Sequence, residues 1–386
     1  MFTDLKRTWA EIDLSALEHN YKALRARVGT RFLGVVKADA YGHGAVEVGR
    51  TLQDLGVDYL AVSSLDEARE LRYNGIYCPI LILGHTPAEQ VPLLIANNIT
   101  QAITNEATAL AYEAQAKAVG SKLRVHVKLD TGMSRLGFVC SDEAFDETVA
   151  SVRRVCKLPH LDAEGVFTHF AVSDEEDEES KRYTALQFDR FMRTIKAVEA
   201  GGHSFRLRHC SNTGAVASYP EVWLDMVRPG LLLYGYGPYA KELGLQPVMR
   251  LKSVIGTEKH YAPGTTVSYG RLFTTERPTR MGVLPIGYAD GLFRILSNRY
   301  SVQTSDGPAP IRGRICMDMC MIDLTDLPNV GQGDEVELFG TRASIDDMAE
   351  LASTIPYELT CAVSRRVLRV YLRDGEIVGQ KLKMNG

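Results

Sequence analysis

The order of apolar and polar residues predicts that the first 235 residues alternate between short strands and helices. Several strand candidates are nearly continuous apolar runs, such as residues 79–84 (PILILG), which is typical of parallel strands covered on both faces. Eight strands are expected, at residues 32–37, 58–63, 79–84, 99–103, 122–129, 161–167, 205–210 and 230–234. This repetition predicts a (β/α)8 barrel. A doubly wound open sheet is the alternative, although no glycine-rich phosphate loop follows the first strand.

The pattern changes near residue 235, where helical spacing becomes rare and β-type segments punctuated by glycine and proline follow one another. One helix is expected among them, at residues 344–353. We therefore predict an α/β chain with a TIM-type barrel over residues 10–237 and a mostly β C-terminal domain over residues 238–386. The segment 8–13 has a strand pattern, and we expect residues 1–9 to pack with the C-terminal domain.

The composition is that of a globular protein. Of the 386 residues, 45% are hydrophobic and 24% are charged, which argues against a disordered, collagen-like or coiled-coil chain. Lys and Arg number 44 against 48 Asp and Glu, and a net charge of −4 argues against general nucleic-acid binding. No apolar run approaches the roughly 18 residues of a membrane span, and residues 1–12 lack the apolar core of a signal peptide. We expect no membrane association and a cytoplasmic location.

Two further features of composition concern metals. The seven cysteines are scattered, and no pair has C-x-x-C spacing, so reduced thiols are expected rather than disulfides or a zinc site. A run of six acids at residues 174–179 (DEEDEE) follows the sixth expected strand and is interpreted as a solvated loop. A cation site is the sharper alternative for this run, but its spacing lacks the pattern of a ligand loop. No metal is predicted.

Polar residues gather where the expected barrel strands end, which is where barrels hold their active sites. Lys37 ends the apolar run of the first strand and is followed by a Tyr41-Gly-His-Gly44 turn. Such a lysine is either a surface residue whose amine reaches solvent, or a nucleophile whose pKa is lowered by desolvation. The second reading suits Schiff-base chemistry.

A second cluster follows the seventh expected strand. Asn212 and Thr213 are residue types of a helix N-cap, and phosphate sites in barrels lie after strands seven and eight. A plain N-cap is the alternative. The segment Arg228-Pro-Gly230 precedes the eighth expected strand. A lysine nucleophile and a phosphate site on one barrel together suggest pyridoxal 5′-phosphate (PLP) as cofactor.

The segment 36–44 (VKADAYGHG) resembles the PLP-lysine signature of the alanine racemases. Further matching motifs span the chain in order: HVKLDTGMSRLG (126–137), EGVFTHF (164–170), VRPGL (227–231), VSYGR (267–271), IGYADG (286–291) and RICMD (314–318). The resemblance implies a PLP-dependent isomerase that interconverts L- and D-alanine, supplies D-alanine for peptidoglycan, and works as a homodimer with active sites shared between subunits. A racemase of serine or of a broader set of amino acids is the alternative.

The resemblance also implies residue roles. Lys37 would bind PLP and act as the base for the D-isomer, while Tyr269 of the other subunit would act on the L-isomer. Lys128 matches a lysine that is often carbamylated in the family, and Arg135 and Met317 would contact the substrate. The cofactor contacts would come from Lys37, Tyr41, Arg135, His169, Asn212, Thr213, Arg228, Gly230 and Leu231.

Two other PLP-binding groups resemble the barrel less closely, and one position of this chain departs from the family pattern. PLP decarboxylases on a similar barrel place an acid at the pyridine nitrogen, where this chain would place Arg228. PLP-carrier proteins resemble the barrel alone and would lack Tyr269. The chain departs from many family members at Arg365, where they carry a tyrosine. An arginine there can pair with phosphate, but it would lose the tyrosine's part in narrowing the substrate gate.

Overall fold

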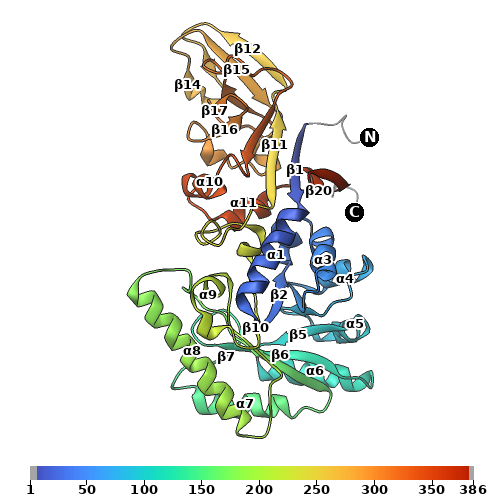
Figure 1. Ribbon diagram of the computed structural model, residues 1–386. Coiled ribbons are helices and arrows are strands. Elements are labelled where there is room, and N and C mark those ends of the chain that lie inside the picture. The colour runs from blue at the N-terminus through green and yellow to red at the C-terminus, as the bar shows by residue number, and fades with distance from the viewer. Residues whose placement is uncertain (1–6, 382–386) are drawn as a thin grey trace. The chain divides into compact units, whose positions relative to one another are not determined.

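The computed structural model describes residues 7–381 and divides into two units (Figure 1). The barrel unit comprises Tyr21–Ala40 and Ala45–Leu233. The β unit comprises the described residues up to Asn20, the short segment Tyr41–Gly44, and the chain from Tyr234 onward. No helix in the described part of the chain is long and apolar enough to cross a membrane.

The barrel unit is built around a parallel sheet that is almost closed on itself. Its strands, in spatial order, are β10 (Met226–Val227), β2 (Arg31–Val35), β3 (Tyr59–Val62), β4 (Ile80–Ile82), β5 (Ile99–Ile103), β6 (Leu123–Asp130), β8 (Leu161–Phe167) and β9 (Leu207–His209). The amide of Asp225 donates to the carbonyl of Arg208 (3.1 Å), and that of Arg228 to the carbonyl of Ser211 (2.9 Å), so β10 closes onto β9. The predicted (β/α)8 barrel is confirmed.

Helices surround this sheet in the barrel unit, as Figure 1 shows. They are α3 (Ala45–Asp54), α4 (Leu65–Tyr73), α5 (Val91–Ala96), α6 (Glu106–Ala118), α7 (Phe145–Cys156), α8 (Glu178–Glu199) and α9 (Thr213–Ser218), and α1 (Leu14–Val28) belongs in part to each unit. Side-chain caps begin several of them: Ser64 accepts from the Glu67 amide and Asn105 from the Thr108 amide. The residues of β3, β4 and β5 are all buried, which explains the continuous apolar runs of β3 and β4.

The eighth strand was predicted at the wrong place. Residues 230–234 include a 3₁₀-helix, η3 (Leu231–Tyr234), and the strand that closes the barrel is the two-residue β10. Pro229 has no N–H to donate to a sheet, and the amide of Leu233 instead donates to the carbonyl of Gly230 (3.0 Å). The run Leu231–Tyr234 is apolar because it is buried, not because it is a strand.

The interpretation of residues 174–179 as a loop is correct only for their first half. All six side chains are exposed, as expected for a solvated run. Asp177, however, caps α8 by accepting from the amides of Glu179 and Ser180, and Glu178 and Glu179 form the helix's first turn. Acids are stabilising there, because the amide end of a helix carries a partial positive charge.

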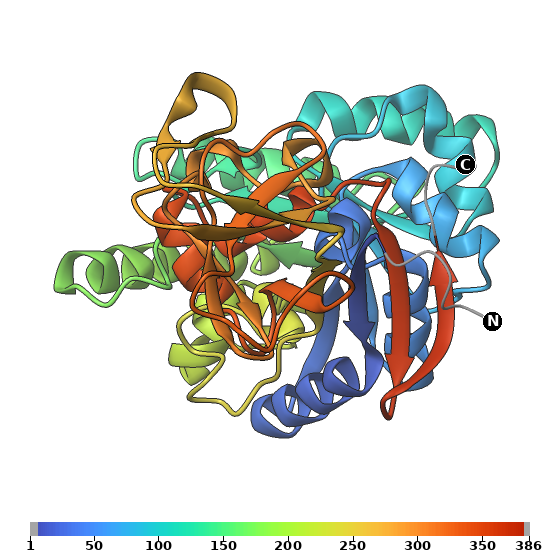
Figure 2. The ribbon, with the colours of Figure 1, turned by 90° about the horizontal axis from the view of Figure 1, so that it is seen from above.

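The β unit contains a seven-stranded sheet in the order β17 (Gly307–Pro310), β16 (Ser301–Thr304), β19 (Glu335–Phe339), β11 (Met249–Val254), β1 (Thr8–Asp13), β20 (Leu368–Arg373) and β21 (Glu376–Lys381). β1 pairs antiparallel with β11 and parallel with β20. Figure 2 shows the dark blue β1 beside the red C-terminal strands. The expected pairing of this segment is confirmed for residues 8–13, whereas residues 1–6 lie outside the described residues.

The rest of the β unit is also rich in strands, so the predicted β character of the C-terminal region is confirmed. A three-stranded sheet joins β12 (Thr257–Tyr261), β15 (Thr279–Leu284) and β18 (Cys320–Asp323), and β13 (Thr266–Val267) pairs with β14 (Phe273–Thr274). The expected helix is α10 (Ile345–Leu351). A second helix, α11 (Pro356–Ala362), was not predicted.

Candidate active site

The barrel unit places most of the predicted site residues just beyond the carboxyl ends of its strands. Lys37 follows β2 by two residues and Arg228 follows β10 directly, while Lys128 lies on β6 near its end. His169 follows β8 by two residues, and Asn212 lies three residues after β9. Because the strands are parallel, these positions belong to one edge of the barrel.

Lys37 begins a turn of unusual backbone conformation. Ala38, Asp39, Ala40 and Tyr41 all have φ between 51° and 58°, which makes the segment a short left-handed helical turn. Each non-glycine residue in this conformation costs roughly 1–2 kcal/mol. Strain of this size persists only where the surrounding structure holds it, and it concentrates at functional sites.

Two carboxylates hold this turn in place. Glu67 on α4 accepts from the amides of Ser63 (2.7 Å) and Ala38 (2.8 Å). Asp39 accepts from the amide of Ala45 (2.8 Å), which is the first residue of α3. The direction in which the Lys37 side chain leaves the backbone is therefore fixed by contacts on both sides of the turn.

Tyr41 and the glycine after it belong to the β unit. The Tyr41 ring is buried, with ring centroids 5.1 Å from Tyr234 and 5.4 Å from Tyr357. Burial, followed by the neighbouring Tyr357, raises the pKa of Tyr41, so its phenol stays protonated and is a hydrogen-bond donor. Gly42 is required, because a Cβ there would lie 2.2 Å from the carbonyl oxygen of Thr360.

A group of cationic side chains surrounds His169. Burial, and then the positive charges of Arg228, Lys128, Arg135 and Lys37, lower the pKa of His169 well below its ordinary value. The imidazole is therefore neutral at physiological pH. Positively charged side chains near one half-buried ring make the site electropositive, which favours an anionic ligand.

Lys128 is the most unusual member of this group. Its side chain is 7% exposed, and its Nζ has no hydrogen-bond partner among the described residues. The amine lies 4.9 Å from the centroid of the Phe167 ring. Burial, followed by the charge of Arg228, lowers the pKa of Lys128 well below its ordinary value. A buried amine without a hydrogen-bond partner among the described residues is costly.

Arg228 is held by a dense set of acceptors. Its guanidinium donates to the carbonyls of Thr168 (2.7 Å) and Cys210 (3.1 Å). It also lies 3.1 Å from Nδ1 of His209 and 3.5 Å from Nδ1 of His169. Burial lowers the pKa of Arg228 to about 10, and the group remains a cation at neutral pH. The result is a fixed, donor-only side chain at the edge of the barrel.

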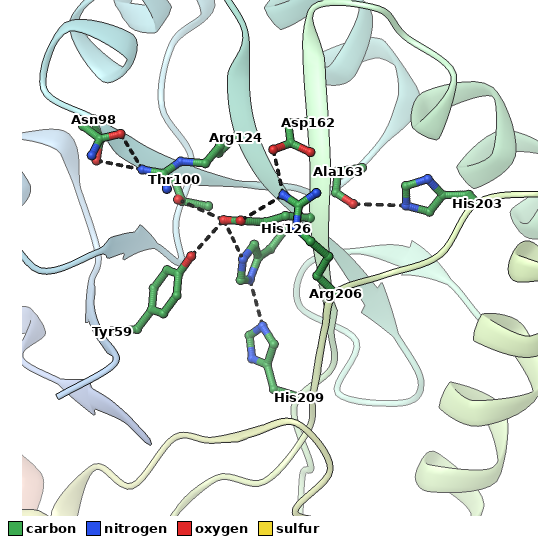
Figure 3. Close-up of polar contacts among 11 residues, drawn as sticks. Tyr59, Asn98, Thr100, Arg124, His126, Asp162, Ala163, His203, Arg206 and His209 are labelled. Atoms are coloured by element: carbon green, nitrogen blue, oxygen red, sulfur yellow. Dashed lines mark hydrogen bonds and ion pairs between the residues drawn. The ribbon is translucent and has the colours of Figure 1, made fainter. Parts of the chain in front are cut away.

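A chain of polar groups continues from Arg228 into the barrel, and sequence reasoning missed it. Figure 3 shows its inner part, which includes His209, His126 and Tyr59. Nε2 of His209 lies 2.8 Å from Nδ1 of His126, and both rings are fully buried. Nε2 of His126 lies 3.5 Å from Oε1 of Glu164, which also accepts from the Tyr59 hydroxyl (2.8 Å). The only sequence signal was polar residues inside otherwise apolar barrel strands.

Asn212 acts as the N-cap that its residue type predicted. Its side-chain oxygen accepts from the amide of Ala215 (3.2 Å) and from the hydroxyl of Ser173 (2.6 Å). The amide of Gly230 donates to the hydroxyl of Thr213 (3.0 Å), so the segments after β9 and β10 meet here. The next residue, Leu231, is buried at the start of η3.

The β unit holds the remaining predicted residues on exposed turns. Tyr269 is 70% exposed and Met317 is 54% exposed. Ser268, in the left-handed region (φ 66°), donates from its hydroxyl to the carbonyl of Arg314 (2.7 Å). Gly287 packs against the same loop, because a Cβ there would lie 2.4 Å from the carbonyl oxygen of Met317. The three C-terminal motifs therefore converge within this unit.

Arg365 is exposed and follows α11 by three residues. The structure gives it no contact that explains an arginine at this position.

Comparison with known proteins places this arrangement in a family. Residues 12–238 match the family model "Alanine racemase, N-terminal domain", and residues 248–371 match "Alanine racemase, C-terminal domain". Alanine racemase 2 of Caldanaerobacter subterraneus subsp. tengcongensis is 42% identical, over 99% of both chains. The alanine racemase of Desulfovibrio desulfuricans is 44% identical, over 94% of this chain and 98% of its own.

Solved structures agree in fold over the whole chain. The alanine racemase of Clostridium difficile 630 superimposes with a TM-score of 0.91 at 39% identity, covering 99% of this chain and 100% of its own. The Bacillus anthracis alanine racemase with bound L-Ala-P gives a TM-score of 0.90 at 29% identity, with 99% of both chains covered. By these matches over both of its domains, the chain belongs to the alanine racemase family of amino-acid isomerases.

Proposed function

We propose that this enzyme racemises alanine with PLP as cofactor and with Lys37 and Tyr269 as its two bases. The observation that carries the proposal is the electropositive site around His169, to which Lys37 contributes from a strained turn. The family match supports racemisation of alanine as the activity. The positive charge of the site is suited to bind an anionic cofactor and the carboxylate of the substrate.

The residues present fit PLP. The cofactor carries a phosphate and a phenolic oxygen, both of which suit cationic and donor groups. Arg135 would bind the phenolic oxygen and the substrate carboxylate, which suits the fork geometry of a guanidinium. The phosphate would be held by the donors that the structure brings together after β9 and β10, with Tyr41 as a further donor. These are Tyr41, Thr213, Gly230 and Leu231, with Asn212 beside them.

When bound, PLP supplies the electron sink that makes the substrate Cα–H acidic. Arg228 would face the pyridine nitrogen. Because a guanidinium only donates and keeps its proton, it would leave the ring nitrogen largely unprotonated. Its four acceptor contacts hold it in that role. A weaker electron sink would restrain side reactions such as transamination.

Racemisation requires a proton to leave one face of Cα and another to arrive on the opposite face, which favours two bases. We assign the D-isomer to the amine of Lys37 and the L-isomer to the phenol of Tyr269. A free tyrosine has a pKa of about 10, so a neighbouring group must stabilise the ionised phenol if it is to act as a base near neutral pH. Because Arg228 can only donate to Nδ1 of His169, the proton of the neutral imidazole lies on Nε2. That N–H is suited to donate a hydrogen bond to the phenol oxygen and so to stabilise its ionised form.

We further propose that Lys128 carries a carbamate. Its amine is buried, unpartnered among the described residues and low in pKa, and a neutral amine is the form that adds to carbon dioxide. Carbamylation would replace a costly buried amine by an anion that positions Arg135.

Tyr269 and Met317 are proposed to act in the site of a second subunit, with Met317 contacting the substrate. Their exposure on turns of the β unit supports this assignment, since both are available to another chain. The proposed domains, residues 10–237 and 238–386, are supported by the family-model limits of 12–238 and 248–371.

The biological setting is also a proposal. All seven cysteines are free thiols, which is typical of a reducing cytoplasm. D-Alanine made there would supply peptidoglycan synthesis.

The test is the conversion of L-alanine to D-alanine by the purified protein with PLP, followed by chiral chromatography. We expect conversion in both directions to the same equilibrium, because the two enantiomers have equal free energy. An enzyme that leaves both enantiomers unchanged would refute the proposal. A parallel panel with serine and other amino acids decides between strict alanine specificity and the broader alternative.

A further inference from the structure

The polar chain inside the barrel has two fixed ends. At the edge of the barrel lies Arg228, which can only donate hydrogen bonds. At the other end lies the carboxylate of Glu164, 7% exposed, which can only accept them when ionised. His209 and His126 lie between them. Nδ1 of His209 faces Arg228, Nε2 of His209 faces Nδ1 of His126, and Nε2 of His126 faces Glu164. Figure 3 shows the contact between the two rings.

These two ends permit one arrangement of protons. Because Arg228 donates, Nδ1 of His209 must accept, and the proton of His209 lies on Nε2. That proton is donated to Nδ1 of His126, so the proton of His126 lies on its Nε2 and faces Glu164. In the opposite arrangement an N–H of His209 would face the N–H groups of Arg228. Oε1 of Glu164 lies 3.5 Å from Nε2 of His126, outside hydrogen-bonding geometry, and as an acceptor facing that N–H it favours the arrangement that Arg228 requires.

Packing fixes both rings, so the proton positions are the variable that remains. The His209 ring stacks on Phe167, with centroids 5.0 Å apart and planes within 3°. The His126 ring lies flat against Gly165, where a Cβ would come within 2.6 Å of it. These contacts hold the planes of both rings, and a flip of the His209 ring within its plane would break its hydrogen bonds with Arg228 and His126. Burial, the largest cause for each, lowers the pKa of both His126 and His209, so both stay neutral.

Glu164 is kept ionised by the donors around it. The Tyr59 hydroxyl donates to Oε1 (2.8 Å), the hydroxyl of Thr100 lies 3.5 Å from the same oxygen, and Arg206 donates to Oε2 (3.1 Å). Burial alone would raise the pKa of Glu164, but the contacts with His126, Tyr59 and Arg206 outweigh it and lower the pKa.

We propose that Glu164 is a positioning residue that holds Arg228 in place by fixing the proton positions of His126 and His209. Its catalytic consequence rests on the proposed function, in which Arg228 faces the ring nitrogen of PLP. The proton positions themselves do not depend on that function and can be measured separately.

The first experiment is ¹⁵N NMR of the full-length protein with labelled histidine, as purified and with added PLP. We expect His126 and His209 to be neutral with the proton on Nε2 throughout pH 6–8. A wild-type spectrum with the proton on Nδ1 of His209 overturns the proposal without any variant.

The second experiment compares two substitutions of Glu164. Glu164→Gln keeps an acceptor oxygen, and we expect the His209 signals to be unchanged and kcat to stay within about threefold of wild type. Glu164→Leu removes the acceptor, and we expect a mixture of His209 protonation forms and a loss of kcat of about tenfold, the lower end of the loss seen when outer partners of catalytic groups are removed. KM should stay within about threefold, because Glu164 does not touch the substrate.

Asp162→Leu is the matched control. Asp162 lies on the same strand, β8, two residues before Glu164, and accepts from the same guanidinium of Arg206 (2.7 Å). It contacts neither histidine, so we expect it to leave the His209 signals and kcat unchanged. A Glu164→Leu protein with wild-type His209 signals and wild-type kcat overturns the proposal. If the wild-type enzyme does not racemise alanine, the proposed function fails while the spectra still decide the proton arrangement.

Discussion

The barrel unit and the β unit present their candidate residues in opposite ways. In the barrel unit Lys128 and Arg228 are buried, and Arg228 alone has four nitrogen or oxygen partners. In the β unit Tyr269 and Met317 lie on exposed turns. Burial prepares groups for chemistry by shifting pKa values and fixing geometry, whereas exposure leaves groups available to another molecule. We infer that the barrel unit holds the cofactor-binding part of its own active site, whereas the β unit offers Tyr269 and Met317 to the active site of another subunit.

The largest effect should follow from removing the barrel's nucleophile. Lys37→Ala should lower racemisation in both directions by at least about 10⁴-fold, because the cofactor attachment and one base are lost together. Chiral chromatography of both reactions measures this. Residual activity within tenfold of wild type would contradict the role of Lys37. We expect the variant to keep the left-handed turn, because the Glu67 and Asp39 carboxylates contact backbone amides that the substitution leaves in place.

The next effect tests the exposed half-site. Tyr269→Phe should reduce turnover by about 10²–10⁴-fold, the usual contribution of a positioned acid–base group. Because Tyr269 is exposed, Tm should change by less than about 1 °C. The matched control is Tyr77→Phe, since Tyr77 is 75% exposed in the barrel unit and belongs to no proposed site. Equal activity of the two variants would show that Tyr269 is not the second base, and it would contradict the proposed division of roles between the two units.

Most of the fold follows from local signals in the sequence. The buried strands β3 and β4 were predictable because burial on both faces demands continuous apolar runs. The same rule misplaced the eighth strand, since the buried 3₁₀-helix η3 is equally apolar. The start of α8 was missed because its first turn is made of acids that also suit a loop. A run of apolar residues indicates that a segment is buried, but it does not show whether the segment is a strand or a helix.

The site was less predictable than the fold. Residue types and strand ends indicated Lys37 and Arg228, but nothing in the spacing indicated that residues 38–41 form a left-handed turn. The roles of Tyr269 and Met317 came from family resemblance and remain predictions. The chain from Arg228 to Glu164 depends on which side chains of different strands share the barrel interior. That is a property of strand register, which a single sequence does not reveal.

A third test concerns the unpartnered amine of the barrel unit. With ¹³C-labelled bicarbonate, a carbamate resonance should appear in the wild-type protein and be absent from a Lys128→Met variant. Methionine keeps the length and burial of the chain while removing the amine. A wild-type spectrum without the resonance would leave Lys128 as a neutral buried amine. In that case Lys128→Met should raise Tm by a few degrees, because a buried polar group without a partner costs about 1–3 kcal/mol.

The smallest expected effect is a change of folding stability with pH, caused by three histidines whose pKa values are lowered in the folded protein. Burial is the largest cause that lowers the pKa of His126, His169 and His209. The unfolded chain, with histidine pKa values near 6.5, therefore binds more protons than the folded protein below that pH. Stability is fully present above about pH 6.5 and should fall by about 1 kcal/mol for each histidine between pH 7 and 5.5. A Tm series checks this, and a flat wild-type curve would contradict the neutral state of the three rings. The control is His260→Ala, which removes an exposed histidine and should follow the wild-type curve.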